Sequence, residues 1–252
     1  MGVMEKMTVA REGTQVLFAS DLMVAFTERH QRPEVATAQR DDRFKKLLGR
    51  ANWMSLPAPI RRRFGKRFKQ GQSVAYQGVI TGMKMSKLGW TFAQAMRVIG
   101  APLPFERNSV DQPAVVIVTE DKETNGQFWI RQYGREAGFP QTVHSSKRFA
   151  GPTGLEEYIG YGVGMALRLK ATKQALFFKS EHYFLQLFGK RLRLPKWLVP
   201  LALTIGHHEL GDHRFAFTLE LTSKFFGTMI EQEAVFADPI EAQDNMKEYR
   251  HA

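Results

Sequence analysis

The stretch GLEEYIGYGVGMALRLKATKQALFFKSEHYFLQL, residues 154–187, decides the fold. Between residues 167 and 172 apolar and polar side chains alternate, which is the period of a β-strand with one buried face. The polar segment 172–174 suits a turn, and Leu176 and Phe178 then resume an apolar face. We therefore predict two long antiparallel strands folded into a hairpin.

The first of these strands has glycine at every second position near its start, at Gly160, Gly162 and Gly164. Glycines inside a strand mark a bend, a bulge or the close approach of another group. We therefore predict a curved sheet with free space over its concave face. The three glycines are candidate ligand-binding residues.

Further strands are predicted on both sides of the hairpin. The segments with a strand pattern are 73–85, 114–119, 127–133, 142–149, 204–210, 213–221 and 228–236. Helices are expected over 88–99, as a helix that fills the sheet, and over 195–203. Because helices do not alternate with strands, we predict an α+β fold. Its sheet would be mostly antiparallel and strongly curved, or a partial barrel, with about nine strands packed on one or more helices.

Composition indicates a globular chain with a real core. It has 252 residues, 43% of them hydrophobic, and no cysteine, so disulfides and thiolate chemistry are excluded. We expect a partly flexible N-terminal extension over residues 1–41, a single domain over 42–238 and a polar tail over 239–252. The N-terminal sequence lacks signal-peptide features, and no apolar run is long enough to span a membrane. A cytoplasmic location is predicted, with peripheral attachment at the inner membrane as the second option.

The formal net charge of +11 favours an acidic partner. The densest basic segment mixes cations with two phenylalanines, and its candidate anionic-surface residues are Arg61, Arg62, Arg63, Lys66, Arg67 and Lys69. The segment 190–197 also mixes bases with apolar residues. Such segments suit an anionic membrane surface or a nucleic-acid groove. Nucleic acid is the less favoured partner, because no nucleic-acid-binding motif occurs.

Two groups of residues are candidates for a ligand or catalytic site. Trp129, Arg131 and Tyr133 share one face of a predicted strand, where a guanidinium between aromatic rings suits an anionic headgroup or a carboxylate. Glu181 and His182 lie among aromatic residues and are weak candidates for acid–base catalysis, since burial shifts the pKa values of such groups.

The segment GHHELGDH, residues 206–213, is a weak candidate for a metal site. His207 and Glu209 share a strand face, and His213 follows a turn. However, the HExxH motif is absent, and a polar hairpin tip would have the same composition. No nucleophile elbow or phosphate-binding loop occurs either, so no metal and no cofactor are predicted.

The chain resembles a known bacterial family in an ordered series of segments. These are LLGRANWMSLP, IRRRFG, YQGVITG, GAPLPF, QFWIRQYG, GLEEYIGYGVGMALRL, LPKWLVP and HRFAFTLEL. The series is similar to the family described as domain of unknown function 4166, over residues 42–238. Members often stand alone or follow an NAD(P)-binding domain of the saccharopine-dehydrogenase type, so the resemblance implies a link to redox or lipid metabolism. It supplies no active-site residue, and the GxGxxG motif of such a domain is absent here.

Three functions remain open at this point. The favoured one is a pocket over the concave sheet that binds a lipid-like or aromatic anionic small molecule, since 19 phenylalanines and 11 methionines can line adaptable apolar walls. The first alternative is an enzyme of unknown reaction that uses Glu181 or His182. The second is a basic surface that binds nucleic acid or a membrane.

Overall fold

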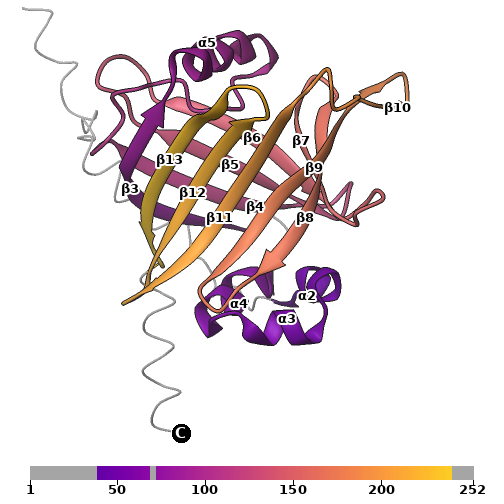
Figure 1. The fold of residues 1–252 in the computed structure, drawn as a ribbon. Helices are drawn as coiled ribbons and strands as arrows, with labels where there is room; N and C mark the ends of the chain where they lie inside the picture. Colours follow the sequence, from indigo (N-terminus) through magenta and orange to yellow (C-terminus); the bar gives the residue numbers. More distant parts are fainter. Residues whose placement is uncertain (1–38, 69–71, 240–252) are drawn as a thin grey trace, which may run out of the picture. The chain divides into compact units, whose positions relative to one another are not determined.

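The computed structural model describes residues 39–68 and 72–239. Ten antiparallel strands form a closed barrel, in which each strand pairs with the next and the last pairs with the first (Figure 1). These strands are β3 (Ser73–Met85), β4 (Pro113–Asp121), β5 (Gly126–Tyr133), β6 (Gln141–Arg148), β7 (Glu156–Gly160), β8 (Val163–Ala171), β9 (Ala175–Leu187), β11 (Leu201–Gly211), β12 (Arg214–Ser223) and β13 (Gly227–Ala237). Closure joins the two edges that an open sheet would expose.

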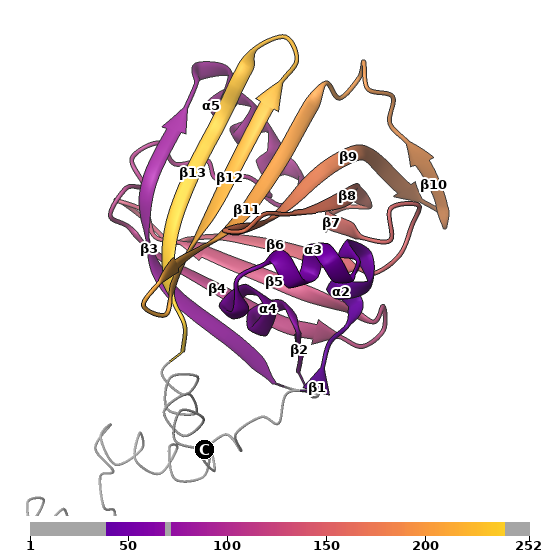
Figure 2. The same ribbon diagram turned by 60° about the horizontal axis from the view of Figure 1, so that its bottom comes forward.

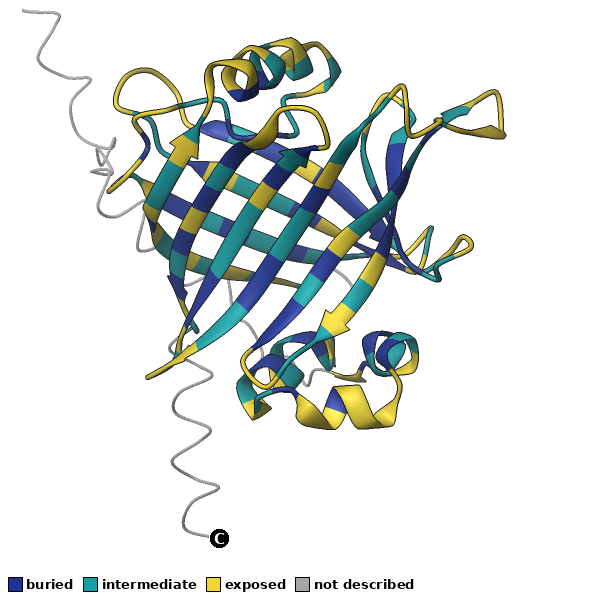
Figure 3. Ribbon diagram, in the orientation of Figure 1, coloured by how far each residue is buried: buried dark blue, intermediate teal, exposed yellow. Residues whose placement is uncertain are grey.

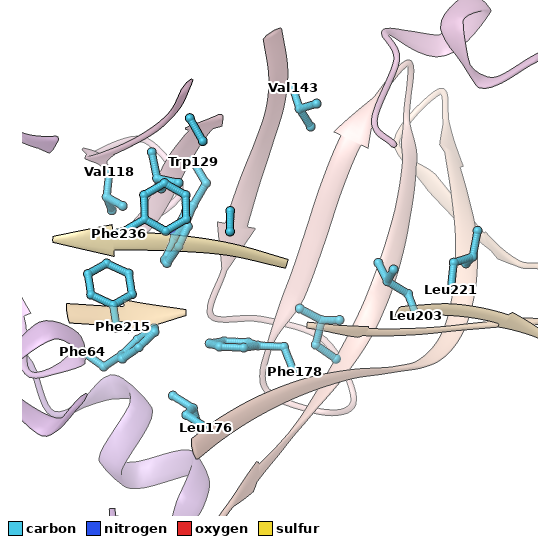
Figure 4. Close-up of a cluster of buried hydrophobic side chains, with 14 of the residues drawn as sticks. Phe64, Val118, Trp129, Val143, Leu176, Phe178, Leu203, Phe215, Leu221 and Phe236 are labelled. Atoms are coloured by element: carbon cyan, nitrogen blue, oxygen red, sulfur yellow. The ribbon is translucent and has the colours of Figure 1, made fainter. Parts of the chain in front are cut away.

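Alternation along the strands separates an apolar interior from a polar exterior. In β12, Phe215 and Leu221 are buried, whereas Arg214 and Glu220 are exposed. Figure 3 shows the same alternation as bands of buried and exposed residues along the sheet. Aromatic rings fill much of the interior, among them Trp129, Phe178, Phe215 and Phe236 (Figure 4).

Helices cover both ends of the barrel (Figures 1 and 2). At one end, which we call the closed end, lie α2 (Arg43–Leu48), α3 (Arg50–Ser55) and α4 (Ala58–Phe64). Phe44 and Phe64 from these helices pack edge to face with ring centroids 5.2 Å apart, and both also contact the ring of Phe178 inside the barrel. These rings therefore plug the closed end.

At the opposite end, which we call the mouth end, lie α5 (Lys87–Ala95) and the short 3-10 helix η1 (Met96–Ile99). The Ser86 side chain caps α5 by accepting a hydrogen bond from the N–H of Gly89. No helix among residues 39–68 and 72–239 is long and apolar enough to cross a membrane.

Two short elements lie outside the ring. The pair β1 (Gln39–Arg40) and β2 (Lys66–Arg67) forms a small ladder of its own. Strand β10 (Lys190–Arg193) pairs with the mouth-end half of β9. The pairing of β9 with β11 extends only from Ala175 to Lys179 on β9, so the two strands separate toward the mouth end (Figure 2).

The structure confirms the mostly antiparallel sheet and corrects its form. The barrel is closed by ten strands and is not partial, and the strands dominate over a few short helices, so α+β describes the fold poorly. The predicted turn at 172–174 is confirmed between β8 and β9. The first predicted strand of the hairpin is in fact two strands, because Tyr161 and Gly162 both have positive φ and form a tight turn.

The two predicted helices, over residues 88–99 and 195–203, differ in the structure. The helix predicted over residues 195–203 is wrong, because Leu201 already begins β11 and prolines stand at 195 and 200. The helix predicted over 88–99 exists as α5 and η1 but lies across the mouth end and does not fill the barrel. The predicted extension and polar tail lie outside the described residues, apart from residues 39–41 and 239.

Candidate functional site

Two adjoining cavities occupy the barrel interior toward the mouth end. The inner cavity has a volume of about 60 Å³ and is bordered by charged side chains from β5, β6 and β7. The mouth cavity has a volume of about 510 Å³, which is the size of an ordinary small-molecule site. The residues that line both cavities are Pro102, Ile159, Met165 and Leu203. The two cavities are therefore neighbours on either side of these four side chains.

The mouth cavity has an almost entirely apolar wall. Its helical side comes from Phe92, Met96 and Ile99, and Leu221 and Met229 line it from β12 and β13. Among its described lining residues, only Tyr183 and Ser223 carry a polar side-chain group. Such a wall suits a hydrocarbon or ring system and provides little to orient a polar one.

The inner cavity contains a buried charge cluster of Arg131, Lys147 and Glu157. Lys147 and Glu157 are direct partners in the β6–β7 ladder, and the Lys147 Nζ donates to Glu157 Oε1 at 2.9 Å. The Arg131 Nη2 donates to the same carboxylate oxygen at 3.0 Å and to Ser145 Oγ at 3.2 Å. Two cations therefore share one carboxylate, and the cluster carries a net positive charge.

Aromatic rings lie beside the Lys147 ammonium, and the environment of the pair lowers the pKa values of both Lys147 and Glu157. The Lys147 Nζ lies 4.5 Å from the ring centroid of Trp129 and 5.4 Å from that of Phe178. Burial lowers the pKa of Lys147 to about 8, although Glu157 opposes this shift. Burial alone would raise the pKa of Glu157, but the charges of Lys147 and Arg131 outweigh it and hold this pKa at about 2. The carboxylate therefore stays ionised at neutral pH.

Arg131 has donors left for a ligand and is the most exposed member of the charge cluster. Its side chain is 18% exposed inside the barrel, whereas the side chains of Lys147 and Glu157 are each 4% exposed. Its Nη2 makes both of the hydrogen bonds described above, and Nη1 and Nε make none to a described residue. A guanidinium with free donors beside an apolar cavity is suited to a carboxylate or phosphate group.

The structure brings the predicted Trp129, Arg131 and Tyr133 together on the wall of the inner cavity. The three predicted glycines lie elsewhere. Gly160 ends β7, and Gly162 lies in the turn between β7 and β8. Gly164 packs against the ring of Phe184 on the outer side of the barrel, where a Cβ would collide with that ring. None of the three lines either cavity, so their role is to permit the turn and this close packing.

Glu181 and His182 lie outside the barrel, beside a groove between β9 and the segment that precedes β11. Glu181 forms an ion pair with Arg168, and this hydrogen bond lowers the pKa of its carboxyl group. Burial lowers the pKa of His182, and its Nδ1 has no hydrogen-bond partner among the described residues. Neither residue lines the inner or the mouth cavity.

The three weak metal candidates have different surroundings and do not form one site among the described residues. His207 is buried inside the barrel beside Phe215, and burial lowers its pKa well below the usual value. Glu209 forms an ion pair with Arg63 at 2.6 Å, and His213 lies in the turn after β11 with a positive φ. The part of the chain that the structure describes contains no group of three side chains placed to hold a metal ion.

The predicted anionic-surface residues lie at the closed end, on α4 and β2. Arg63 is almost buried, pairs with Glu209 and Asp238, and covers the face of Phe215. Arg67 pairs with Glu120, and the Arg61 Nη1 contacts the sulfur of Met54. Arg62 and Lys66 are exposed, and Lys69 lies outside the described residues.

A pocket was predicted over the concave sheet, but sequence reasoning missed Lys147, Ser145 and the residues that line the mouth cavity. The usable signal was alternation in β6, where Val143, Ser145 and Lys147 share one strand face with the cavity. The wall of the mouth cavity had no comparable signal, since it combines α5, η1, the segment 194–200 and parts of six strands: β7, β8, β9, β11, β12 and β13.

Two comparisons with known proteins bear on the chain. The model of the family described as "Domain of unknown function (DUF4166)" matches residues 56–236. The comparison with curated proteins gives no match. The family match contains nine of the ten barrel strands in full and nearly all of β13, together with every residue of the charge cluster.

Proposed function

This chain belongs to the DUF4166 family, and we propose that the barrel within the matched region binds an amphipathic, anionic small molecule. The apolar body of the ligand occupies the mouth cavity, and its acidic group reaches Arg131 in the inner cavity. Long-chain acids and apolar ring systems with a carboxylate or phosphate group have this chemistry. No reaction is part of this proposal.

The observation that carries the proposal is the contact between an apolar cavity of about 510 Å³ and a buried cluster with net positive charge. A buried charge is costly unless it is paired and hydrogen-bonded. Glu157 neutralises one of the two cations, and the remaining charge faces a cavity of about 60 Å³. That space is sufficient for an acidic group or a few water molecules.

The two alternative functions have less support. An enzyme using Glu181 or His182 would have to act in the outer groove, where the Arg168 ion pair keeps Glu181 ionised and unsuited to donate a proton. A nucleic-acid surface on α4 and β2 would lose Arg63 and Arg67 to ion pairs with Glu209, Asp238 and Glu120. Both remain predictions from the sequence.

Native mass spectrometry of the purified chain, followed by organic extraction, tests the proposal. We expect a bound acid of defined mass, present in wild-type protein and in Lys170→Met but depleted in Arg131→Met. Lys170 is the matched control because it is an exposed cation on the outer side of β8. Absence of any bound molecule, together with failure to take up added long-chain acids, would contradict the proposal.

A further inference from the structure

The mouth end has an exposed surface of apolar and basic side chains outside the inner and mouth cavities. We call it the docking face. It consists of the segment 188–200, which contains β10, and the turn 224–226 between β12 and β13. The two parts are neighbours, because the backbone N–H of Lys224 donates to the carbonyl oxygen of Pro200 at 3.1 Å.

Large apolar side chains cluster on the docking face. The exposed ones are Phe188, Leu192, Trp197, Leu198, Phe225 and Phe226. Elsewhere among the described residues, the exposed large hydrophobic side chains are spread over α3, β3, α5, η1, β5, β9, β11 and three connecting segments: Met54, Val79, Leu88, Trp90, Val98, Val110, Phe128, Phe139, Tyr161, Leu187 and Leu210. Scattered exposed hydrophobic residues are ordinary, whereas a cluster marks an interaction surface.

The docking face is also strongly basic. Its two segments contain five cations and no acidic residue. Arg191 forms an ion pair with Glu156. The other four cations are exposed and form no ion pair with a described residue: Lys190, Arg193, Lys196 and Lys224. The charge is therefore available to an anionic partner.

The docking face lies beside an opening of the mouth cavity. Leu198 and Phe226 line that cavity, and yet they are 55% and 62% exposed. The opening lies where β9 and β11 have separated, and the segment 194–200 crosses this part of the wall. A molecule that leaves the mouth cavity here meets the exposed apolar cluster first.

We propose that the docking face binds the surface of an anionic lipid bilayer and that the ligand passes between bilayer and cavity through this opening. Aromatic side chains insert at the interface, and the four free cations contact lipid phosphates. A bilayer fits better than nucleic acid, because aliphatic Leu192 and Leu198 offer no stacking surface to bases. The passage of ligand rests on the proposed function, whereas the docking itself rests only on this surface.

The test is flotation of the full chain with vesicles of phosphatidylglycerol and phosphatidylcholine, or of phosphatidylcholine alone, at low salt. One variant, K190Q/R193Q/K196Q/K224Q, removes the free cations. A second, W197S/F225S, removes apolar side chains that do not line the mouth cavity. The matched controls are K46Q/R50Q/K170Q/K173Q, which neutralises four exposed cations away from the mouth end, and M54S/L210S.

We expect wild-type protein and both controls to float with the anionic vesicles and not with the neutral ones. The charge variant should bind at least about tenfold more weakly, since each cation near an anionic surface contributes about fivefold. The apolar variant should lose binding but still take up a fluorescent fatty acid in solution. Equal binding by all variants, equal loss in the controls, or binding to an oligonucleotide and not to vesicles would overturn the docking proposal. Vesicle binding without any fatty-acid uptake would contradict the ligand site and leave docking supported.

Discussion

Lys147 and Glu157 face each other across neighbouring strands inside the barrel, with 2.9 Å between the ammonium nitrogen and a carboxylate oxygen and with each side chain only 4% exposed. Arg131 donates to the same oxygen, so this carboxylate joins three strands, β5, β6 and β7. The pair therefore holds together the part of the inner-cavity wall where we place the acidic group of the ligand. Its energetics give two predictions on stability and one on binding.

Breaking this pair should cost far more than breaking an exposed one. Removing the shared carboxylate leaves two buried cations, Lys147 and Arg131, without a counter-charge, so Glu157→Gln should lower the free energy of unfolding by about 3 kcal/mol. The double variant K147M/E157Q should lose less than the sum of its single changes. The measurement is urea unfolding of each variant.

The control for this cycle is the exposed pair Lys84–Glu231, whose side chains are 85% and 43% exposed. The variant K84M/E231Q should change the free energy of unfolding by less than about 1 kcal/mol. A cost for Glu157→Gln as small as that of the control would show that the buried pair has no structural role.

Acid should weaken the fold through Glu157. The folded-state pKa of this carboxyl, about 2, lies below its ordinary value of 4.5, so the unfolded chain binds more protons between these two pH values. Stability from this group is therefore fully present above pH 4.5 and is lost as the pH falls toward 2, by on the order of 3 kcal/mol. Thermal unfolding over a pH series should show a shallower acid slope in Glu157→Gln than in wild-type protein or in Glu231→Gln. Identical slopes in all three proteins would contradict this assignment.

Binding of an anionic ligand should weaken as the pH rises through about 8. The Lys147 ammonium loses its proton there, so the cluster of Arg131, Lys147 and Glu157 becomes neutral above this pH. A long-chain alkyl sulfonate stays ionised throughout, and its dissociation constant should rise by up to about tenfold per pH unit above 8. The corresponding alcohol serves as the neutral control and should bind independently of pH. A sulfonate affinity without change between pH 7 and pH 9, about one unit on either side of this pKa, would place the acidic group elsewhere.

Barrel closure should depend on Gly78. This residue lies opposite Phe236 where β3 meets β13, and a Cβ here would collide with the carbonyl oxygen of Val235. Gly78→Ala should therefore lower the free energy of unfolding by about 1–3 kcal/mol. Gly82→Ala, in the same strand, places its Cβ at an ordinary 3.6 Å from Glu233 and should be nearly neutral. Equal stability of the two variants in urea unfolding would show that the seam tolerates a side chain.

Much of the strand set could be predicted because each strand carries its own pattern. The bounds of β3 agree with the predicted 73–85, and the turn at 172–174 lies where its polar residues indicated. Closure could not be predicted in this way, since it depends on pairing between β3 and β13 at opposite ends of the domain. The break at Tyr161 was missed because a non-glycine residue with positive φ leaves little trace in a sequence.

The site was predictable only in part. Arg131 and its ring neighbours shared a strand face in the sequence, and they share a cavity wall in the structure. Lys147 was missed because a charged side chain at an inward position contradicts the hydrophobic pattern from which strand faces are assigned. The three glycines were predicted to leave free space over the concave face. In the structure Gly160 and Gly162 lie at a turn, and the ring of Phe184 occupies the space beside Gly164.

The decisive measurement is a fluorescence titration of wild-type protein, Arg131→Met and Lys170→Met with a long-chain fatty acid probe and with its methyl ester. We expect the wild-type protein and Lys170→Met to bind the acid more tightly than the ester. Arg131→Met should lose at least about tenfold in affinity for the acid and little for the ester, since a charge-assisted hydrogen bond is worth about 1.5–3 kcal/mol. Equal affinity of Arg131→Met and wild-type protein for the acid, or no binding of either probe to any of the three proteins, would contradict an anionic ligand inside this barrel.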